Sequence, residues 1–207
     1  MYKISTSILA SNNLIDTIKK LNKSITDYIH LDVMDGLFVP NTKFSIEELK
    51  DIISLIKKPI DIHLMVENPL PYIKAINNPN VEYITIHIEI NQDINSLINT
   101  IKSSGYKVCL AIKPNTNIEK IIPYIEKIDM VIIISVEPVY SVQKFIPNSV
   151  ERLKAIKKIN KKILTEVDGG INNDTITYVK DYTDIIVSGS YIINNPNYNK
   201  AIINLKK

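Results

Sequence analysis

Short apolar runs rich in isoleucine and valine alternate along the chain with stretches of helical periodicity. The apolar runs show little alternation with polar residues, which is typical of parallel strands that are covered on both faces. This pattern predicts eight strands, at residues 2–9, 28–34, 59–66, 83–88, 107–112, 130–136, 162–167 and 184–187.

The intervening stretches predict amphipathic helices. In the first of them, Leu14, Ile18 and Leu21 recur at helical spacing. Ser45 and Glu48 have the spacing of a capping box at the start of the second, and Gly105 suits a helix C-terminus. The predicted helical stretches are residues 11–23, 45–58, 91–107, 115–127, 147–161 and 172–182.

Eight β–α units within residues 1–207 predict a single-domain (β/α)8 TIM barrel, at about 26 residues a unit. A doubly wound open sheet is the alternative, because it also alternates strands and helices. Polar residues at the ends of many predicted strands favour the barrel, where strand ends converge on one mouth. They are Ser7, His30, Asp32, His63, His87, Asp168, Gly189 and Ser190.

Composition and charge narrow the class of protein. The formal net charge is only +3, and no block of basic residues marks a nucleic-acid or membrane surface. The single Cys109 excludes an internal disulfide and suits a reducing compartment. No apolar run approaches the length of a membrane span or a signal segment. We therefore expect a cytoplasmic protein that binds neither nucleic acid nor membranes.

Two histidines and two aspartates form the candidate chemical site. His30 and Asp32 are two residues apart, so they face the same side of a strand. His63 and Asp168 lie near the ends of two further strands. Imidazole and carboxylate ligands suit one divalent transition metal ion, with Zn²⁺ or Fe²⁺ preferred and Mn²⁺ or Co²⁺ as alternatives.

Other residues near these strand ends have plainer interpretations. His87 is not expected to bind the metal. Asp61 could be catalytic because it is close to His63, but the preferred interpretation is that it orients a neighbour or is solvated. Met34 and Met65 line the site or simply fill the core. Asp35 with the glycine after it is interpreted as a turn.

Several motifs together resemble the ribulose-phosphate 3-epimerase family: "SILASN", "IHLDVMDGLFVPN", "DIHLMVENP", "ITIHIE", "VDGGI" and "SGSYI". The resemblance implies a barrel of the ribulose-phosphate-binding type, usually metal-dependent and homo-oligomeric. Such enzymes interconvert D-ribulose 5-phosphate and D-xylulose 5-phosphate by two-base proton transfer at C3. It implies that His30, Asp32, His63 and Asp168 bind the metal and that Asp32 and Asp168 are the catalytic acid and base. The implied substrate-binding residues are Ser7, His63, Gly169, Gly170, Gly189 and Ser190.

The chemistry agrees with this assignment independently. Epimerisation beside a carbonyl group removes a weakly acidic proton and returns one to the other face, which requires two bases. The intermediate is an enediolate, whose negative charge a bound cation stabilises.

The chain departs from the family in the loop after the sixth strand. Val139, Ser141 and Val142 replace glycines of the family motif, and Tyr140 lies among them as a candidate lid residue. Valine tolerates positive φ badly, so the phosphate lid must take another path if those positions require it. Two alternatives follow: a 3-epimerase of a related ketose phosphate such as D-allulose 6-phosphate, or a catalytically impaired paralogue that only binds sugar phosphates.

Overall fold

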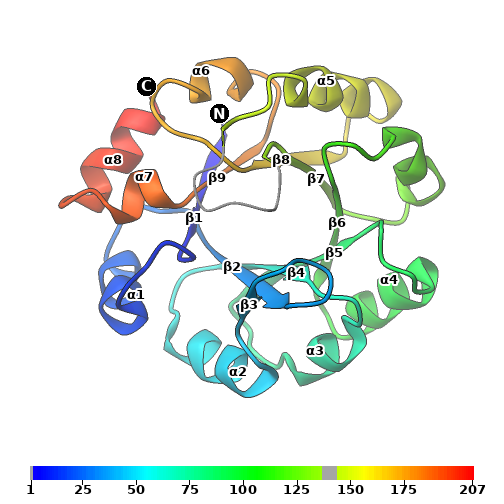
Figure 1. The fold of residues 1–207 in the computed structure, drawn as a ribbon, viewed down its shortest axis with the longest axis horizontal. Helices are drawn as coiled ribbons and strands as arrows, with labels where there is room; N and C mark the ends of the chain where they lie inside the picture. Colours follow the sequence, from blue (N-terminus) through cyan, green and yellow to red (C-terminus); the bar gives the residue numbers. More distant parts are fainter. Residues whose placement is uncertain (1, 137–143) are drawn as a thin grey trace.

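The computed structural model describes residues 2–136 and 144–207, and within them eight parallel strands close into a barrel (Figure 1). Each strand pairs with the next around the ring, and the pairing of β1 with β2 closes it. The predicted TIM barrel is therefore confirmed. The barrel strands are β1 (Lys3–Ser7), β2 (Tyr28–Asp35), β4 (Ile60–Met65), β5 (Val81–His87), β6 (Lys107–Ile112), β7 (Met130–Ile134), β8 (Leu164–Asp168) and β9 (Ile185–Ser188).

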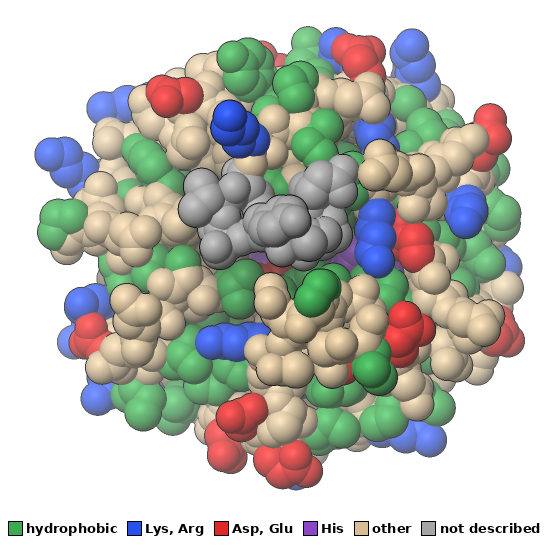
Figure 2. All heavy atoms as spheres, in the orientation of Figure 1, with side chains coloured by type: hydrophobic (Ala, Val, Ile, Leu, Met, Phe, Trp, Pro, Cys, Tyr) green, Lys and Arg blue, Asp and Glu red, His purple; other side chains and the backbone are tan. Residues whose placement is uncertain are grey.

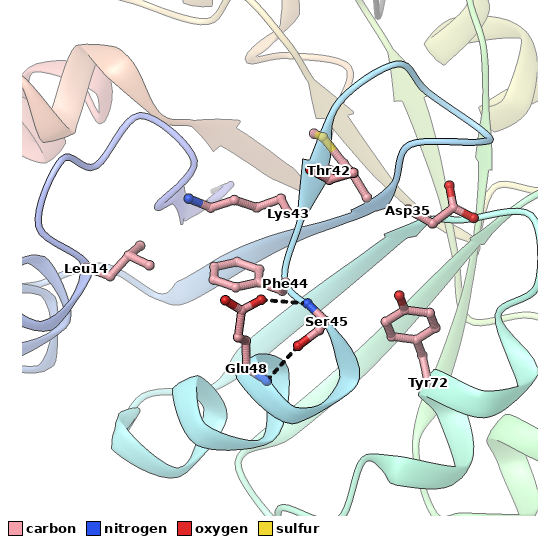
Figure 3. A pocket seen from close by; sticks show the side chains of 9 residues that line it. Leu14, Asp35, Thr42, Lys43, Phe44, Ser45, Glu48 and Tyr72 are labelled. Carbon is pink, nitrogen blue, oxygen red and sulfur yellow. Dashed lines mark hydrogen bonds between the residues drawn. The ribbon is translucent and has the colours of Figure 1, made fainter.

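Helices form an outer ring around these strands (Figure 1). They are α1 (Leu14–Asn22), α2 (Ile46–Leu55), α3 (Leu70–Ala75), α4 (Ile94–Ser103), α5 (Ser149–Ile159), α6 (Ile176–Val179), α7 (Ser190–Ile193) and α8 (Tyr198–Leu205). The capping box predicted for α2 is present, because Ser45 and Glu48 bond each other's backbone N–H groups (Figure 3). Gly105 follows α4 with a φ of +86°, as its predicted role requires. In the described part of the chain, no helix combines the length and the apolar composition needed to cross a membrane.

Several elements differ from the sequence prediction, and the helices α3, α7 and α8 lie outside the predicted helical stretches. The stretch predicted as a helix at 115–127 contains a 3₁₀ segment, η1 (Ile118–Tyr124), with Pro123 inside it. Proline lacks the N–H that an α-helix needs and collides with the preceding turn, so the longer helix does not form. The short strand β3 (Thr42–Lys43), which was not predicted, pairs antiparallel with the end of β2.

The barrel interior changes character along its axis. Tyr28, Tyr83 and Met130 are buried together in its apolar part. Toward the ends of the strands, the buried side chains become polar and ionisable, as at His30 and His63. A second, larger apolar layer, dominated by isoleucine, packs the helices onto the barrel. The apolar layers therefore fix the positions of these ionisable groups. Burying any one of them without a partner would be energetically costly.

Candidate active site

Strand register brings the predicted metal-binding side chains together. Asp32 on β2 is the register partner of His63 on β4, and His30 is the partner of Asp61. Asp168 ends β8 on another part of the ring. His30 and His63 are completely buried, whereas the Asp168 side chain is 20% exposed. Histidine and acidic side chains are visible near the middle of the face in Figure 2.

The spacing of these four side chains suits a metal ion. Nε2 of His30 lies 3.3 Å from Asp32 Oδ1 and 3.9 Å from Asp168 Oδ2. Nδ1 of His63 lies 3.5 Å and 3.6 Å from the same two oxygens. Ligand atoms about 2.0–2.1 Å from a tetrahedral Zn²⁺ are about 3.3–3.4 Å apart. Among the described residues, both nitrogens are buried without a hydrogen-bond partner, so the four groups could hold one ion.

A second group of acidic residues lies beside His30 but has a different geometry. Asp61 Oδ2 is 2.6 Å from His30 Nδ1, which is a hydrogen-bond distance and too short for two ligands of one metal. Burial raises the pKa of Glu166 well above its usual value, and the nearby Asp61 adds to the rise. As an acid, Glu166 can donate a proton to Asp61, which supplies the donor that two carboxylates lack. This inner group therefore supports His30 and is not a metal site.

The electrostatics also favour a cation. Burial opposes a charge on His30, yet Asp61 and Asp32 raise its pKa well above the usual value. Burial likewise opposes ionisation of Asp32, yet His30 and His63 hold its pKa well below the usual range. The carboxylates thus draw positive charge into the site, and a bound metal would take the place of protons.

Hydrogen bonds hold the carboxylate of Asp32 and the backbone of Asp168 in place. Ser7 Oγ donates to Asp32 Oδ2 over 2.7 Å. The backbone carbonyl of Asp168 accepts from the N–H of Ser135 at 2.8 Å, and Ser135 Oγ donates to the carbonyls of Asp168 and Gly169. Ser135, which sequence analysis did not single out, therefore anchors the turn that carries Asp168.

The two glycines after Asp168 are required by the backbone. Gly169 and Gly170 have φ values of +117° and +67°, which side-chain-bearing residues rarely adopt. A Cβ on Gly169 would collide with the Val136 side chain, and one on Gly170 would lie 3.0 Å from the backbone nitrogen of Phe145. This turn therefore packs closely against the chain segments on both sides of residues 137–143.

His63 contacts a second histidine on its other side. Its Nε2 lies 2.8 Å from Nε2 of His87, and the two rings meet edge to edge, with centroids 5.0 Å apart and planes inclined by 20°. His87 Nδ1 lies 3.0 Å from Glu89 Oε2, and Glu89 Oε1 accepts from the backbone N–H of Lys113 at 2.7 Å. Burial lowers the pKa of His87 to about 4, so its ring is neutral at pH 7. Phe38 covers this ring at a centroid distance of 4.6 Å.

The remaining predicted residues have more varied positions. Met34 and Met65 are mostly buried register partners at the ends of β2 and β4. Gly189 precedes α7 and approaches Ser7, and Ser190 begins that helix. The candidate lid residues Val139, Tyr140, Ser141 and Val142 lie outside the described residues.

A surface cavity of about 480 Å³ lies beside this site (Figure 3). Thr42, Lys43 and Phe44 line one side of it, and Met34 reaches its wall. The four metal-site residues are not among the described residues that line it. The cavity is therefore distinct from the chemical site.

The sequence analysis left Asp61 with three interpretations and missed Glu89 and Glu166. The structure places Asp61 1% exposed and at a hydrogen-bond distance from His30, which agrees with the interpretation that it orients a neighbour. Glu89 lies two residues after His87, and Glu166 lies two residues before Asp168. The strand alternation that placed His30 with Asp32 could have found Glu166, whereas Glu89 lies in the turn after β5 and gave no such signal.

Comparison with known proteins agrees with the barrel and its site. The model of the "Ribulose-phosphate 3 epimerase family" matches residues 3–193. The ribulose-phosphate 3-epimerase of Aquifex aeolicus is 37% identical over 80% of this chain and 77% of its own length. That of Methanocaldococcus jannaschii is 35% identical over 100% of this chain and 91% of its own. Among solved structures, KGPDC from Streptococcus mutans superimposes with a TM-score of 0.72 at 14% identity, covering 100% of this chain and 96% of its own, which supports the fold alone.

The structure is a TIM barrel with a candidate metal cluster at its strand ends, and the family match makes it an enzyme that acts on carbohydrate. More specifically, the chain belongs to the ribulose-phosphate 3-epimerase family, whose members are isomerases.

Proposed function

We propose that this protein interconverts D-ribulose 5-phosphate and D-xylulose 5-phosphate by epimerisation at C3, with one divalent metal ion. The observation that carries the proposal is the meeting of Asp32 and Asp168 around two buried imidazole nitrogens that lack hydrogen-bond partners among the described residues. His30, Asp32, His63 and Asp168 would hold the ion. When bound, it supplies Lewis-acid stabilisation of negative charge on the substrate oxygens.

The two carboxylates move the proton. Asp32 Oδ1 faces the imidazoles, while Oδ2 accepts from Ser7 and keeps a lone pair for a substrate proton. Asp168 directs Oδ2 toward the imidazoles, which leaves Oδ1 to carry a proton. One carboxylate removes the C3 proton next to the carbonyl group, and the other returns a proton to the opposite face of the planar enediolate.

Backbone amides are the proposed phosphate clamp, at Gly170, Gly189 and Ser190. Support comes from the single arginine of the chain, because the guanidinium of Arg152 donates to three backbone carbonyls. Glycine allows a close approach of the backbone to an anion. Homo-oligomer formation and a cytoplasmic location stay predictions from the sequence.

A coupled assay of ribulose 5-phosphate epimerisation tests the proposal, with purified protein supplied with Zn²⁺, Fe²⁺, Mn²⁺ or Co²⁺. We expect turnover that chelation abolishes and that Asp168→Asn lowers by about 10²–10⁴-fold. Full activity in that variant would contradict the two-base mechanism.

A hexulose phosphate such as D-allulose 6-phosphate is the second candidate substrate. It is favoured by the replacement of family glycines at 139, 141 and 142. The ratio of kcat/KM for the pentulose and hexulose phosphates distinguishes the two substrates. Stoichiometric binding of both without turnover would instead indicate an impaired paralogue.

A further inference from the structure

The contacts of His63 place it at one end of a chain of hydrogen bonds that leads away from the metal site. Its Nε2 contacts Nε2 of His87, whose Nδ1 contacts Glu89 Oε2. Each contact has a hydrogen-bond distance, 2.8 Å and 3.0 Å, and the His63 and His87 rings are buried. None of the predicted functions above uses His87 or Glu89.

The direction of this chain follows from counting donors and acceptors. A neutral imidazole has one N–H donor and one acceptor nitrogen. If Nδ1 of His63 offers its lone pair to a metal, the proton of His63 is on Nε2 and is donated to His87. His87 then carries its own proton on Nδ1 and donates it to Glu89, which is a carboxylate and accepts.

Glu89, at the far end of this series of hydrogen bonds, is held firmly. Glu89 has two oxygens, and each already has a donor: Oε2 faces His87 and Oε1 accepts the Lys113 N–H. The side chain is only 14% exposed, so water does not easily replace either donor. Burial opposes ionisation of Glu89, but the contact with His87 lowers its pKa to about 2. The carboxylate therefore remains an acceptor over the physiological pH range.

We propose that Glu89 and His87 are positioning residues for the metal site. Two hydrogen bonds in series hold the proton of His63 on Nε2 and direct its Nδ1 toward the cluster of His30, Asp32 and Asp168. Carboxylates that orient metal-binding imidazoles typically change metal affinity by about 10–100-fold when they are removed. The inference rests on the proposed metal site and adds two residues to it.

The substitution Glu89→Gln tests the direction of the two hydrogen bonds, because glutamine has one side-chain oxygen where glutamate has two. If that oxygen stays on the Lys113 N–H, the amide NH₂ faces His87 Nδ1 and reverses both hydrogen bonds. His63 then carries its proton on Nδ1, the atom that must face the metal. We expect Co²⁺ to bind about 10–100-fold more weakly and the visible spectrum of the bound Co²⁺ to change.

The matched control is Glu82→Gln, the same substitution on β5, the strand that leads into Glu89, where the carboxylate pairs with an exposed lysine. We expect it to bind Co²⁺ like the wild type. His87→Phe removes the acceptor of the His63 proton and should weaken binding, whereas His87→Gln offers an acceptor and a donor and should restore part of it. Equal Co²⁺ affinity of Glu89→Gln and Glu82→Gln overturns the positioning role.

A measurement on the wild-type protein avoids any dependence on folded variants. The chain has only three histidines, so their ring nitrogens can be distinguished by long-range ¹H–¹⁵N NMR of the Zn²⁺-loaded protein. The expected result is a proton on Nε2 of His63 and on Nδ1 of His87. A proton on Nε2 of His87 overturns the inference, while a wild-type protein that binds no metal overturns the proposed metal site itself.

Discussion

Asp61 Oδ2 lies 2.6 Å from Nδ1 of His30, on the side of the imidazole ring that faces away from the candidate metal site. A neutral ring that donates from Nδ1 has its lone pair on Nε2, the atom that faces Asp32 and Asp168. One buried carboxylate thus determines which nitrogen of His30 is available to a metal.

The first prediction concerns this carboxylate. Asp61→Leu removes the acceptor of the Nδ1 proton, so metal affinity should fall by about 10–100-fold. The unpaired buried donor should also lower the free energy of unfolding by about 1–3 kcal/mol. Asp61→Asn keeps an acceptor, so it should lose less metal affinity and less stability than Asp61→Leu. Co²⁺ titration and urea unfolding measure the two effects, and a leucine variant with wild-type affinity would contradict the orienting role.

The second prediction separates the two proposed bases. Asp32→Asn and Asp168→Asn should each lower epimerisation by about 10²–10⁴-fold, yet each variant keeps one carboxylate on one face of the substrate. Each should therefore still exchange the C3 hydrogen of one epimer with D₂O, and the two variants should act on opposite epimers. NMR of each sugar phosphate in D₂O measures this exchange. Exchange of both epimers by one variant would show that a single base serves both faces.

The third prediction uses two glycines with positive φ. Gly105 and Gly169 have φ values of +86° and +117°, but only at Gly169 would a Cβ meet another group closely, the Val136 side chain. Gly105→Ala should cost about 1–2 kcal/mol for the backbone conformation alone. Gly169→Ala should cost more and should also lower activity, because the turn that carries Asp168 must move. Equal losses of stability in urea unfolding would mean that the contact with Val136 is unimportant.

The fourth prediction concerns pH and the turn after β2. Burial opposes ionisation of Asp35, but N–H donors of Phe38, Glu67 and Leu37 at 2.7–2.9 Å lower its pKa. A lowered folded-state pKa stabilises the fold above the unfolded pKa of about 3.9, and this contribution is lost as pH falls below that value. Asp35→Asn should therefore cost about 1 kcal/mol at pH 7.

The difference between wild type and Asp35→Asn should shrink at pH 3, because Asp35 of the unfolded wild-type chain, with a pKa of about 3.9, is then mostly protonated. Urea unfolding of both proteins at the two pH values measures it. A difference that is constant with pH would mean that the charge on Asp35 contributes nothing to the turn.

Much of the site could be predicted because its residues follow the rules of strands. His30 and Asp32 are two residues apart and share one face of their strand. In a barrel, the ends of the strands meet at one mouth. Glu89 was missed because it lies in the turn after β5, where no strand periodicity relates it to His87. Glu166 was missed because a buried, unpaired glutamate is rare, and only the three-dimensional contact with Asp61 gives it a role.

The secondary-structure elements that were not predicted depend on local sterics or on long-range packing. Pro123 sits inside a helical pattern and leaves only a 3₁₀ segment, although its neighbours have suitable periodicity. The hairpin strand β3 has two residues, too few for any hydrophobic pattern to reveal. Ser135 gave no signal either, because its partners are the backbone carbonyls of residues 168 and 169, which are far away in the sequence.

The last prediction concerns Arg152, the single arginine of the chain. Its guanidinium is mostly buried and donates to the carbonyls of Lys113, Pro114 and Thr116 at 2.7–2.8 Å. A lysine ammonium is a single point that cannot reproduce this planar set of donors. Arg152→Lys should therefore lower the free energy of unfolding by about 1–3 kcal/mol.

The same variant tests how phosphate is bound. Because the guanidinium is engaged with the protein backbone, Arg152→Lys should leave KM for ribulose 5-phosphate nearly unchanged at temperatures where the variant is folded. Lys158→Met, which removes an exposed lysine from the same helix, serves as the control for both measurements. A large rise in KM for Arg152→Lys alone would mean that arginine, and not the backbone amides of Gly170, Gly189 and Ser190, holds the phosphate.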